Sequence, residues 1–545
     1  MARFTGMTYV APFIMLCSIA ANVDLGAQTP ASCDTFLPPA RDARGQKVGP
    51  SSCQMLDIAA TIAGRAYRRI DVGLDGTVDG FVTRTGDYKE YLTNAPDLVF
   101  PQTADDGQRF HAVAKYERAK GAAMTIVFPS DAASWNGKVW VTVHGRGTSF
   151  KEGNLKPWDK SLNPAQPAAD LNKYDLLMLS KGFALVKTRR TSSEGLGEII
   201  ATLENGTTID DIAFNDSARY IMDFASVADN AIAKYLGTPP ARRYFYGHSA
   251  GARIGRGLNY IPGLNVDRDG GAFFDGVLAD DGAAGGWLPV LFKDGKDVLL
   301  MSAADKAKFV PQIDVSHQMY NNIWPSKMPD YMSASYLANK RSNARILRDK
   351  GLTSKHRMYE VRGISHSGGE NLPDGKRGEV QILDMSKLMD RFIDMLDAWV
   401  ERGTQPPPSR SDDPQVARGG TNLPSIALPE IACPLGVYFP FPNSVAGTTS
   451  FAAFTGRGLE PLDQLKVFVD MNRNGVWDQR ETVEQAWRRM GLLGVNETLT
   501  RDRYASCVQS AARSLVSDGF LSETSAARYV EQARTVELPA TRPEV

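Results

Sequence analysis

The chain has 545 residues, of which 43% are hydrophobic and 23% charged, a balance typical of folded globular proteins and unlike that of disordered or membrane-embedded chains. Lysine and arginine together number 62, as do aspartate and glutamate, so no net field favours nucleic acid or an anionic membrane. At roughly 150 residues per domain, the length predicts two to four domains. We therefore expect a small-molecule or polymeric uncharged substrate and no nucleic-acid partner.

The N-terminal residues have the pattern of a targeting segment. Arg3 precedes the apolar stretch from Val10 to Ala21, which is too short to span a bilayer, and small residues suited to cleavage follow as far as Ala27. We predict a signal peptide over residues 1–27, a secreted or periplasmic protein, and no stable membrane insertion after cleavage. A buried apolar N-terminal helix is the alternative. Residues 28–120 would form an N-terminal extension.

Removal of the signal peptide would leave an even number of cysteines. No two of them have the C-x-x-C spacing of metal or redox sites, and an exported protein meets an oxidising compartment, so structural disulfides are expected. Three pairings are possible, and closeness in sequence favours Cys33 with Cys53 and Cys433 with Cys507.

Short apolar runs alternate with helical patterns between residues 121 and 402, as they do in parallel sheets whose strands are joined by helices. The runs from Ala123 to Pro129 and from Lys138 to Gly145 flank an Asn-Gly turn, which predicts paired strands, and Gly182 to Thr188 predicts the next strand. Apolar residues recur every three or four positions from Asp216 to Leu236, which predicts a helix. We expect an α/β fold with a doubly wound, mostly parallel sheet.

The sequence Gly-His-Ser-Ala-Gly, centred on Ser249, follows the strand-like run that comes after this helix. A strand that passes into a helix through this pentapeptide turns so sharply that side chains at Gly247 and Gly251 would clash. The serine hydroxyl is then exposed at the helix N-terminus, where the positive end of the helix stabilises negative charge. We predict that Ser249 is a nucleophile; a small residue in a tight turn is the alternative.

Four features in this chain order resemble the α/β-hydrolase superfamily, and within it the exported serine esterases, over roughly residues 120 to 400. The first two are His-Gly-Arg-Gly, which begins at His144 directly after a strand, and the serine turn. In that family a loop of the first kind supplies one N–H group that binds the oxyanion. The resemblance assigns this donor to Gly145 or Arg146 and the second donor to Ala250, the residue after the nucleophile.

The third feature is an acid, which follows the serine in the family. The resemblance implies Asp305, because the apolar run that starts at Lys296 predicts a strand before it and a loop after it. The alternatives are Asp280, Asp281 and Asp314.

The fourth feature is a histidine that comes after the acid. The resemblance implies His366, which follows a well-patterned helix and a short strand and begins a glycine-rich loop. His317 is the main alternative by chain order, whereas His356 lies before the last strand rather than after it.

These residue types suit acyl transfer. A neutral imidazole removes the serine proton during attack, and a carboxylate fixes the tautomer of that imidazole. We therefore expect a serine hydrolase that cleaves carboxylic esters through an acyl-enzyme and needs no cofactor for catalysis. The same residues acting on amides or lactones are an alternative, and a catalytically inactive, calcium-stabilised adhesion or carbohydrate-binding protein is another.

The choice of substrate depends on the segment from His317 to Tyr336, which is rich in Tyr, Trp and Met. Such residues line apolar acyl or aryl pockets, although ordinary packing on the sheet explains them equally well. Together with export, this composition favours aryl esters or polyester fragments.

Residues 403–425 concentrate proline, glycine, serine and charge, which predicts an exposed linker before a smaller, mainly helical C-terminal module at residues 426–545. Helical patterns in this module cover Arg480 to Leu493, Arg501 to Phe520 and Ser522 to Ala533.

The module also contains Asp-x-Asn-x-Asn-Gly-x5-Glu from Asp470 to Glu481, which resembles an EF-hand loop. The run before it, Leu465 to Val469, predicts a strand where an EF-hand has a helix, so we expect a lone structural Ca²⁺ site. An Asx-rich turn without metal is the alternative. The oxygens that could surround the ion come from the side chains of Asp470, Asn472, Asn474, Asp478 and Glu481 and the carbonyl of Val476.

Overall fold

The structure is a computed structural model. The residues that it describes are 40–41, 47–48, 50–74, 83–87, 110–115, 122–144, 171–189, 199–203, 208–209, 214–248, 250–260, 265–267, 269–280, 292–293, 296–297, 303–317, 336–364, 376–377, 380–381, 383–417, 423–435, 467–469, 478–479 and 482–538. No helix within these ranges is both long and apolar enough to cross a membrane.

A nine-stranded sheet forms the centre of the fold, with the order β17-β16-β13-β12-β8-β9-β7-β4-β3. All pairs from β9 to β17 are parallel, whereas β3, β4 and β7 are joined to each other and to β9 by antiparallel pairs. The predicted α/β class with a mostly parallel sheet is therefore confirmed. The strands are β3 (Pro50–Ile62), β4 (Arg65–Leu74), β7 (Ala122–Pro129), β8 (Lys138–His144), β9 (Ala184–Arg189), β12 (Arg242–His248), β13 (Gly276–Asp280), β16 (Gln312–His317) and β17 (His356–Val361).

Two predictions about this sheet need correction. The strands β7 and β8 do not pair through the Asn-Gly turn between them, because β9 lies between the two and pairs with both. The predicted boundary near residue 121 does not hold either, because β3 and β4 belong to the same sheet as the later strands. In both cases the partner strand comes from far along the chain, where local turn signals carry no information.

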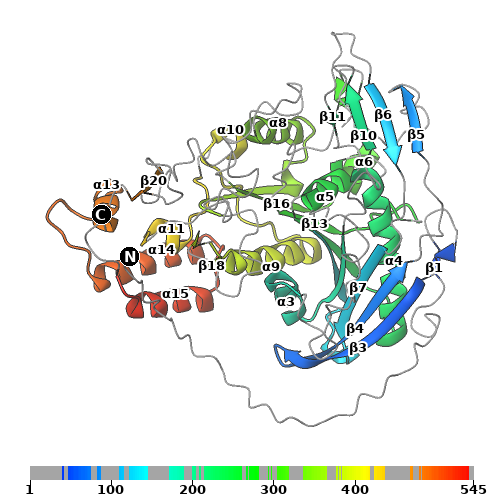
Figure 1. Ribbon diagram of the computed structural model, residues 1–545, viewed down its shortest axis with the longest axis horizontal. Coiled ribbons are helices and arrows are strands. Elements are labelled where there is room, and N and C mark those ends of the chain that lie inside the picture. The colour runs from blue at the N-terminus through cyan, green and yellow to red at the C-terminus, as the bar shows by residue number, and fades with distance from the viewer. Residues whose placement is uncertain are drawn as a thin grey trace, which may run out of the picture.

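Helices cover both faces of the sheet. The helices α4 (Phe214–Leu236) and α5 (Ala250–Tyr260) pack with Phe245 of β12 on one face. On the other face, α3 (Lys173–Ser180) and α9 (Ser386–Arg402) pack with Tyr244 and Tyr246, because successive side chains of a strand point to opposite faces. The arrangement is visible in Figure 1 and buries the strands on both sides, which is why their sequences are almost continuously apolar.

Local signals set the ends of two of these helices. Asn172 and Asp175 form a reciprocal capping box at the start of α3, in which each side chain accepts a hydrogen bond from the other residue's backbone N–H. The helix α9 ends where Gly403 adopts a left-handed conformation with φ of 68°, which glycine tolerates without a steric penalty.

The remaining described elements are shorter. The small strands are β1 (Ala40–Arg41), β2 (Lys47–Val48), β5 (Thr83–Asp87), β6 (Phe110–Lys115), β10 (Ile199–Leu203), β11 (Thr208–Ile209), β14 (Phe292–Lys293), β15 (Lys296–Asp297), β18 (Lys376–Arg377), β19 (Val380–Gln381), β20 (Val467–Val469) and β21 (Asp478–Gln479). The other helices are η1 (Ala132–Ser134), α6 (Ala303–Lys308), α8 (Tyr336–Asp349), η4 (Thr353–Lys355), α10 (Pro414–Ala417), α11 (Pro429–Ala432), α13 (Val483–Arg489), α14 (Arg501–Ser517) and α15 (Glu523–Thr535).

The segment expected to be an exposed linker instead packs along β17. Arg410 and Ile426 form parallel bridges to Tyr359 and Val361, and the backbone N–H of Glu360 donates to the carbonyl of Arg410 at 2.9 Å. Ser411 is fully buried. This polar stretch, whose composition predicts a linker, therefore hydrogen-bonds along β17, the edge strand of the sheet. Its composition gives no sign of this pairing.

The C-terminal helices share a hydrophobic core with the sheet. The ring of Phe520 meets that of Tyr359 on β17 edge-on, with centroids 5.0 Å apart, and Tyr359 also stacks on Phe392 of α9. Figure 1 shows these orange and red helices beside α9 and α11. The predicted helices are present, and among the described residues their buried side chains belong to the same hydrophobic core as the sheet face that α3 and α9 cover.

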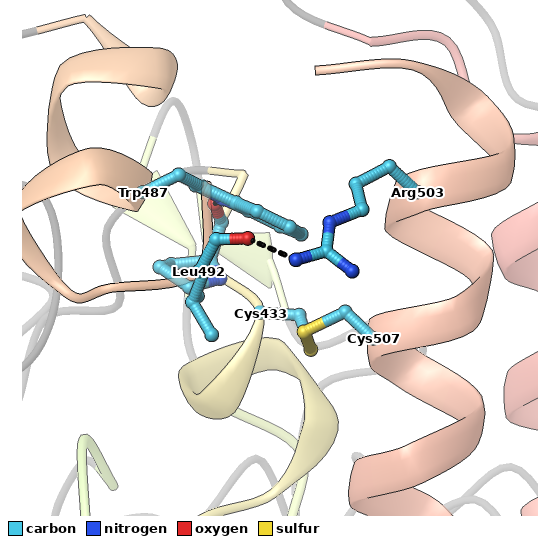
Figure 2. Close-up of a disulfide and its surroundings, with 6 residues drawn as sticks. Cys433, Trp487, Leu492, Arg503 and Cys507 are labelled. Carbon is cyan, nitrogen blue, oxygen red and sulfur yellow. Dashed lines mark hydrogen bonds between the residues drawn. A yellow bond between two sulfur atoms is a disulfide. The ribbon is translucent and has the colours of Figure 1, made fainter. Parts of the chain in front are cut away.

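A disulfide between Cys433 and Cys507 links the end of α11 to α14. Figure 2 shows this bond beside Trp487, whose indole N–H donates to the carbonyl of Pro434 at 2.7 Å. The pairing is the one that closeness in sequence favoured. Cys33 lies outside the described residues, as does the side chain of Cys53, so the other predicted pair stays a prediction.

Candidate active site

The turn between β12 and α5 is as tight as the sequence predicts. The strand ends at His248 and the helix begins at Ala250, so a single residue, Ser249, separates them. A Cβ atom on Gly247 would lie 2.1 Å from the carbonyl oxygen of Gly251, and one on Gly251 would lie 2.3 Å from the carbonyl oxygen of Val143. Both positions therefore require glycine. Ser249 and the side chain of Ala250 lie outside the described residues.

The parallel register brings the ends of three strands together. His248 at the end of β12 lies level with His144 at the end of β8 and with Asp280 at the end of β13. In open α/β sheets, ligands bind at this carboxyl edge. The strand β8 ends where the His-Gly-Arg-Gly segment was expected to start, although Gly145 and Arg146 themselves are not described.

A buried polar cluster lies at this edge. Nδ1 of His248 is 3.0 Å from Oδ2 of Asp280, and the hydroxyl of Tyr246 donates to the same oxygen at 2.9 Å. The side chains of Asp280 and His248 are almost completely buried, at 1% and 2% exposure. The second carboxylate oxygen, Oδ1, is also buried and has no hydrogen-bond partner among the residues that the structure describes. The sequence pointed to Asp280 only as an alternative acid.

The expected surroundings of Asp305 are wrong. Asp305 lies within helix α6 and not in the expected loop. Of the strand expected before it, the structure describes only β15, which pairs with β14 and not with the central sheet, and β16 begins after α6. The amino group of Lys355, just before β17, donates to the carbonyls of Ala307 and Phe309 at 3.2 and 2.6 Å. The backbone at Asp305 is thus near the amino edge of the sheet, opposite the edge where β12 ends. The prediction failed because the apolar pattern does not reveal which run joins the sheet.

The alternative acid Asp314 has a different set of partners. It is fully buried in β16; its Oδ1 accepts from Nε of Arg256 at 2.8 Å, and its Oδ2 accepts from Gln312 at 3.0 Å and lies 2.5 Å from Nε2 of His356. Burial acts to raise the pKa of this carboxyl, but the charge of Arg256 and the contact with His356 lower it to about 2. Asp314 and His356 therefore contact each other in the protein interior.

The remaining candidates are only partly described. His317 ends β16 at the carboxyl edge, but its side chain is not described, and Asp281 and His366 lie outside the described ranges. The chain enters the segment that contains His366 from β17, which is parallel to β12, as the predicted order of strand and histidine requires.

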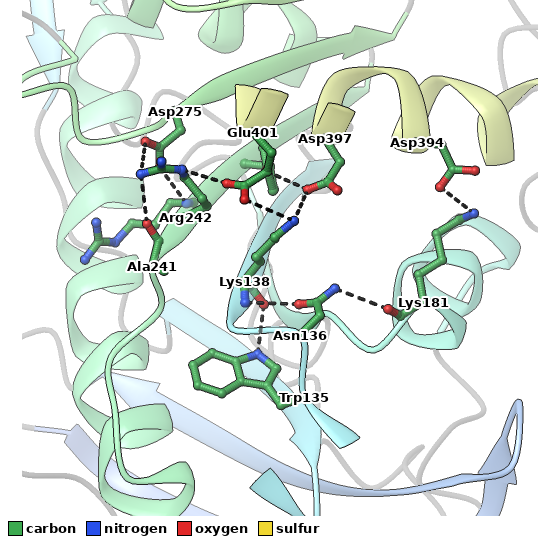
Figure 3. A network of polar contacts seen from close by, with 12 residues as sticks. Trp135, Asn136, Lys138, Lys181, Ala241, Arg242, Asp275, Asp394, Asp397 and Glu401 are labelled. Atoms are coloured by element: carbon green, nitrogen blue, oxygen red, sulfur yellow. Dashed lines mark hydrogen bonds and ion pairs between the residues drawn. The ribbon is translucent and has the colours of Figure 1, made fainter. Parts of the chain in front are cut away.

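A second polar network lies at the opposite edge of the sheet, and sequence reasoning missed it. Lys138 and Arg242, the first residues of β8 and β12, make ion pairs at 2.7 and 2.8 Å with Asp397 and Glu401 of α9 (Figure 3). Both pairs are partly exposed to solvent, and ion pairs that water can reach contribute little each. They fasten the end of α9 to the amino edge, so these charges are structural partners of one another.

The predicted calcium loop begins directly after β20, which confirms the strand expected at that place. The strand β21, at Asp478–Gln479, pairs with β20 in antiparallel fashion, so the two ends of most of the loop are held together. The described residues include no cluster of three or more His, Cys, Asp or Glu side chains that could hold a metal. The proposed ligands Asp470, Asn472, Asn474, Val476 and Glu481 and the side chain of Asp478 lie outside the description.

Comparison with known proteins gives one extensive match. A family model described as "Alpha/beta hydrolase domain" matches residues 130–531, a range that runs through the expected linker into α15. No curated protein matches the chain.

Several solved structures resemble parts of the chain at low identity. The poly(3-hydroxybutyrate) depolymerase from Bordetella parapertussis is 15% identical, with 55% of this chain and 91% of that chain covered and a TM-score of 0.28. Feruloyl esterase B from Aspergillus oryzae is 12% identical, with 66% and 88% covered and a TM-score of 0.31. Poly(aspartic acid) hydrolase-1 from Sphingomonas sp. KT-1 is 14% identical, with 52% and 94% covered and a TM-score of 0.27. These likenesses are too weak to assign a substrate.

Proposed function

The chain belongs to the alpha/beta hydrolase domain family, whose model matches residues 130–531, and on that premise we propose that it cleaves carboxylic esters with Ser249 as its nucleophile. The observation that carries the proposal is the turn around Ser249. A strand, one residue and a helix follow each other with glycines that can bear no side chain, and this geometry serves to expose a serine hydroxyl at a helix N-terminus.

The proposed reaction uses residues of the chain alone. His366 removes the hydroxyl proton of Ser249 as the oxygen attacks the ester carbonyl, and it then protonates the departing alcohol. The backbone N–H of Ala250, with that of Gly145 or Arg146, stabilises the oxyanion. The N-terminus of α5 adds the positive end of its dipole. Water, activated by the same histidine, then hydrolyses the acyl-enzyme.

The substrates we favour are aryl esters or polyester fragments. The connection between β16 and α8 leaves the sheet at the carboxyl edge, where β16 ends at His317. It contains the Tyr, Trp and Met residues that suit an apolar acyl or aryl pocket.

The test combines covalent labelling with turnover. Purified protein is treated with a fluorophosphonate probe, which reacts with activated serines, and assayed with short and long p-nitrophenyl esters. Ser249→Ala should lose labelling and on the order of 10³-fold or more in turnover. Ser226→Ala, which removes a hydroxyl bonded within α4, is the matched control and should keep both.

The outcomes separate the alternatives. If Ser249→Ala loses labelling, and wild type turns over p-nitroanilides or lactones but not esters, the serine mechanism stands and the substrate class changes to amides or lactones. Wild-type protein that neither labels nor turns over any of these compounds would remove the hydrolase proposal and favour a binding protein.

We also propose that the loop from Asp470 to Glu481 binds a structural Ca²⁺ ion. Its spacing of oxygen-bearing residues supports this, as does the β20–β21 pair, which holds Val469, just before the loop, opposite Asp478 at the ninth loop position. Because Trp477 lies inside the loop, bound Tb³⁺ should luminesce when the indole is excited. Asp470→Asn should weaken the binding of both Tb³⁺ and Ca²⁺. Trp477→Phe should remove the luminescence but leave Ca²⁺ binding, measured by calorimetry, intact. Unchanged binding in Asp470→Asn would refute the site.

Export is proposed on the N-terminal pattern alone. Protein expressed with residues 1–27 should be recovered from the periplasm or the medium with an N-terminus near residue 28, as mass spectrometry would establish. Recovery of the full-length chain inside the cell would contradict it.

A further inference from the structure

We propose that Asp280, and not Asp305, is the carboxylate that positions the catalytic histidine, and that His248 and Tyr246 hold this carboxylate in place. The inference rests on the proposed serine mechanism. It concerns which of the available acids completes that mechanism.

The first argument is position. Asp280 is the last residue of β13, the strand next to β12, and it lies level with His248, the residue before Ser249. Neighbouring strands are about 4.8 Å apart, so the backbone of Asp280 is one strand spacing from the end of β12. Asp305 lies in α6, before β16 begins, and so near the other edge of the sheet.

The second argument is the hydrogen bonding of the carboxylate. Oδ2 of Asp280 is held by Tyr246 and lies beside Nδ1 of His248, which fixes the orientation of the group. Oδ1 is buried and lacks a partner within the described part of the chain. A buried acceptor left without a donor costs about 1–3 kcal/mol, and more when it is charged. An imidazole N–H would satisfy that oxygen, which is the role of the acid in a serine hydrolase.

The third argument is the path of the chain after β17. The strand β17 is two strand spacings from β13, with β16 between them, a lateral distance of about 10 Å. His366 follows Val361, the end of β17, by five residues. The chain turns at Gly363, where φ is 66°, and buries Ile364 in the core on the same sheet face as Tyr246. His366 therefore follows, two residues later, from the face of the sheet to which Asp280 belongs.

The fourth argument removes one competitor. Both oxygens of Asp314 already have partners, namely Arg256 on one side and Gln312 with His356 on the other. Asp314 also lies on the other face of the sheet. Its carboxylate contacts Arg256 of α5, whereas Asp280 contacts Tyr246, which packs on the face that α3 and α9 cover. Asp314 therefore cannot supply a free carboxylate to the histidine without breaking a buried network.

The test compares three isosteric variants, Asp280→Asn, Asp305→Asn and Asp281→Asn, with wild type in p-nitrophenyl ester turnover. Asp280→Asn should lower kcat by on the order of 10³- to 10⁴-fold, with KM within about threefold, because an amide supports the wrong imidazole tautomer. Asp305→Asn and Asp281→Asn should remain within about threefold of wild type. Circular dichroism shows whether each variant is folded.

A double-variant comparison separates positioning from structure. If Asp280 acts through His366, then Asp280→Asn should cost little further turnover in a His366→Ala background, since residues that act as a unit are not additive. An equal loss in both backgrounds would make the role of Asp280 structural and would overturn the proposal. Turnover by Asp280→Asn close to wild type would also overturn it.

Failure of the mechanism itself has a different signature. If Ser249→Ala keeps its turnover and labelling, the proposed function is wrong; if Ser249→Ala is inactive but Asp280→Asn is active, only the choice of acid is wrong. Should Asp280→Asn fail to fold, Asp305→Asn decides: a folded Asp305→Asn variant with turnover as low as Ser249→Ala overturns the proposal, and full turnover supports it.

Discussion

Arg256 and Asp314 form an ion pair without solvent exposure, in which Nε of Arg256 lies 2.8 Å from Oδ1 of Asp314. Arg256 belongs to α5, the helix after Ser249, and Asp314 to β16. Because His356 of β17 contacts the other oxygen of Asp314, three elements meet at one carboxylate. A buried pair of this kind adds little to stability as a whole, but the loss of one partner leaves a buried charge and costs about 3–5 kcal/mol.

The first prediction concerns acid stability. The pKa of Asp314 is lowered from 3.8 to about 2, so its ionised form contributes stability that is present above pH 4 and is lost as the pH falls towards 2. A shift of this size corresponds to about 2 kcal/mol. In urea unfolding, Asp314→Asn should be less stable than wild type at pH 6, and the difference should shrink between pH 4 and pH 2. Asp57→Asn, which removes an exposed carboxylate, is the control. A difference independent of pH would contradict the assignment.

The second prediction concerns the C-terminal helices. Phe520 is fully buried against Tyr359, so Phe520→Ala should destabilise the protein by about 3 kcal/mol or more and lower the temperature at which the sheet itself unfolds. Val495→Ala, at a residue that is 86% exposed, should leave that temperature almost unchanged. The measurement is thermal unfolding followed by circular dichroism. Two separate transitions, with only one of them shifted, would show that the helices fold on their own.

The third prediction concerns the disulfide. Cys433 and Cys507 are 74 residues apart, and closing a loop of that length is worth about 4 kcal/mol in the chain-entropy model. The double variant Cys433→Ser with Cys507→Ser should therefore unfold at a lower temperature than oxidised wild type. Reductant should lower the unfolding temperature of wild type more than that of the double variant, and the two proteins should unfold at about the same temperature once reduced. A wild type that resists reductant while the variant melts early would point to lost packing and not to the bond.

The fourth prediction concerns the turn at Ser249. Gly247→Ala would place a Cβ 2.1 Å from a carbonyl oxygen, which forces the backbone to move. Because misplacement of a nucleophile by about 1 Å can cost 100-fold, ester turnover should fall at least that far. Gly494→Ala is the control, because its new Cβ would come no closer than 3.4 Å to the side chain of Glu497. Normal turnover by Gly247→Ala would refute the role of this turn.

The local parts of the fold could be predicted from the sequence. The helix with apolar residues every three or four positions became α4, the apolar runs became β7, β8 and β9, and the run before the calcium loop became β20. The glycine at Gly247 predicted the tight turn because its steric conflict is with Gly251, four residues along the chain, whereas Gly251 is restricted by Val143 of the neighbouring strand β8. The pairing of Cys433 with Cys507 could be anticipated from closeness along the chain.

The choice among aspartates could not be made in this way. Asp280, Asp305 and Asp314 all follow or interrupt apolar runs, and nothing in those runs indicates which joins the sheet or which edge a carboxylate reaches. The partners that distinguish them, Tyr246 and His248 for Asp280 and Arg256 and His356 for Asp314, lie 32 or more residues away along the chain.

By itself, the sequence determined the fold class, the helical and extended segments, and the turn at Ser249, because periodicity and steric demands act between near neighbours. Only the tertiary structure decided the order of the strands, the attachment of residues 403–425 to β17 and the shared core with the C-terminal helices. It also decided which carboxylate stands beside the serine turn. These features depend on burial and hydrogen bonding between distant segments, and such contacts arise only when the chain has folded.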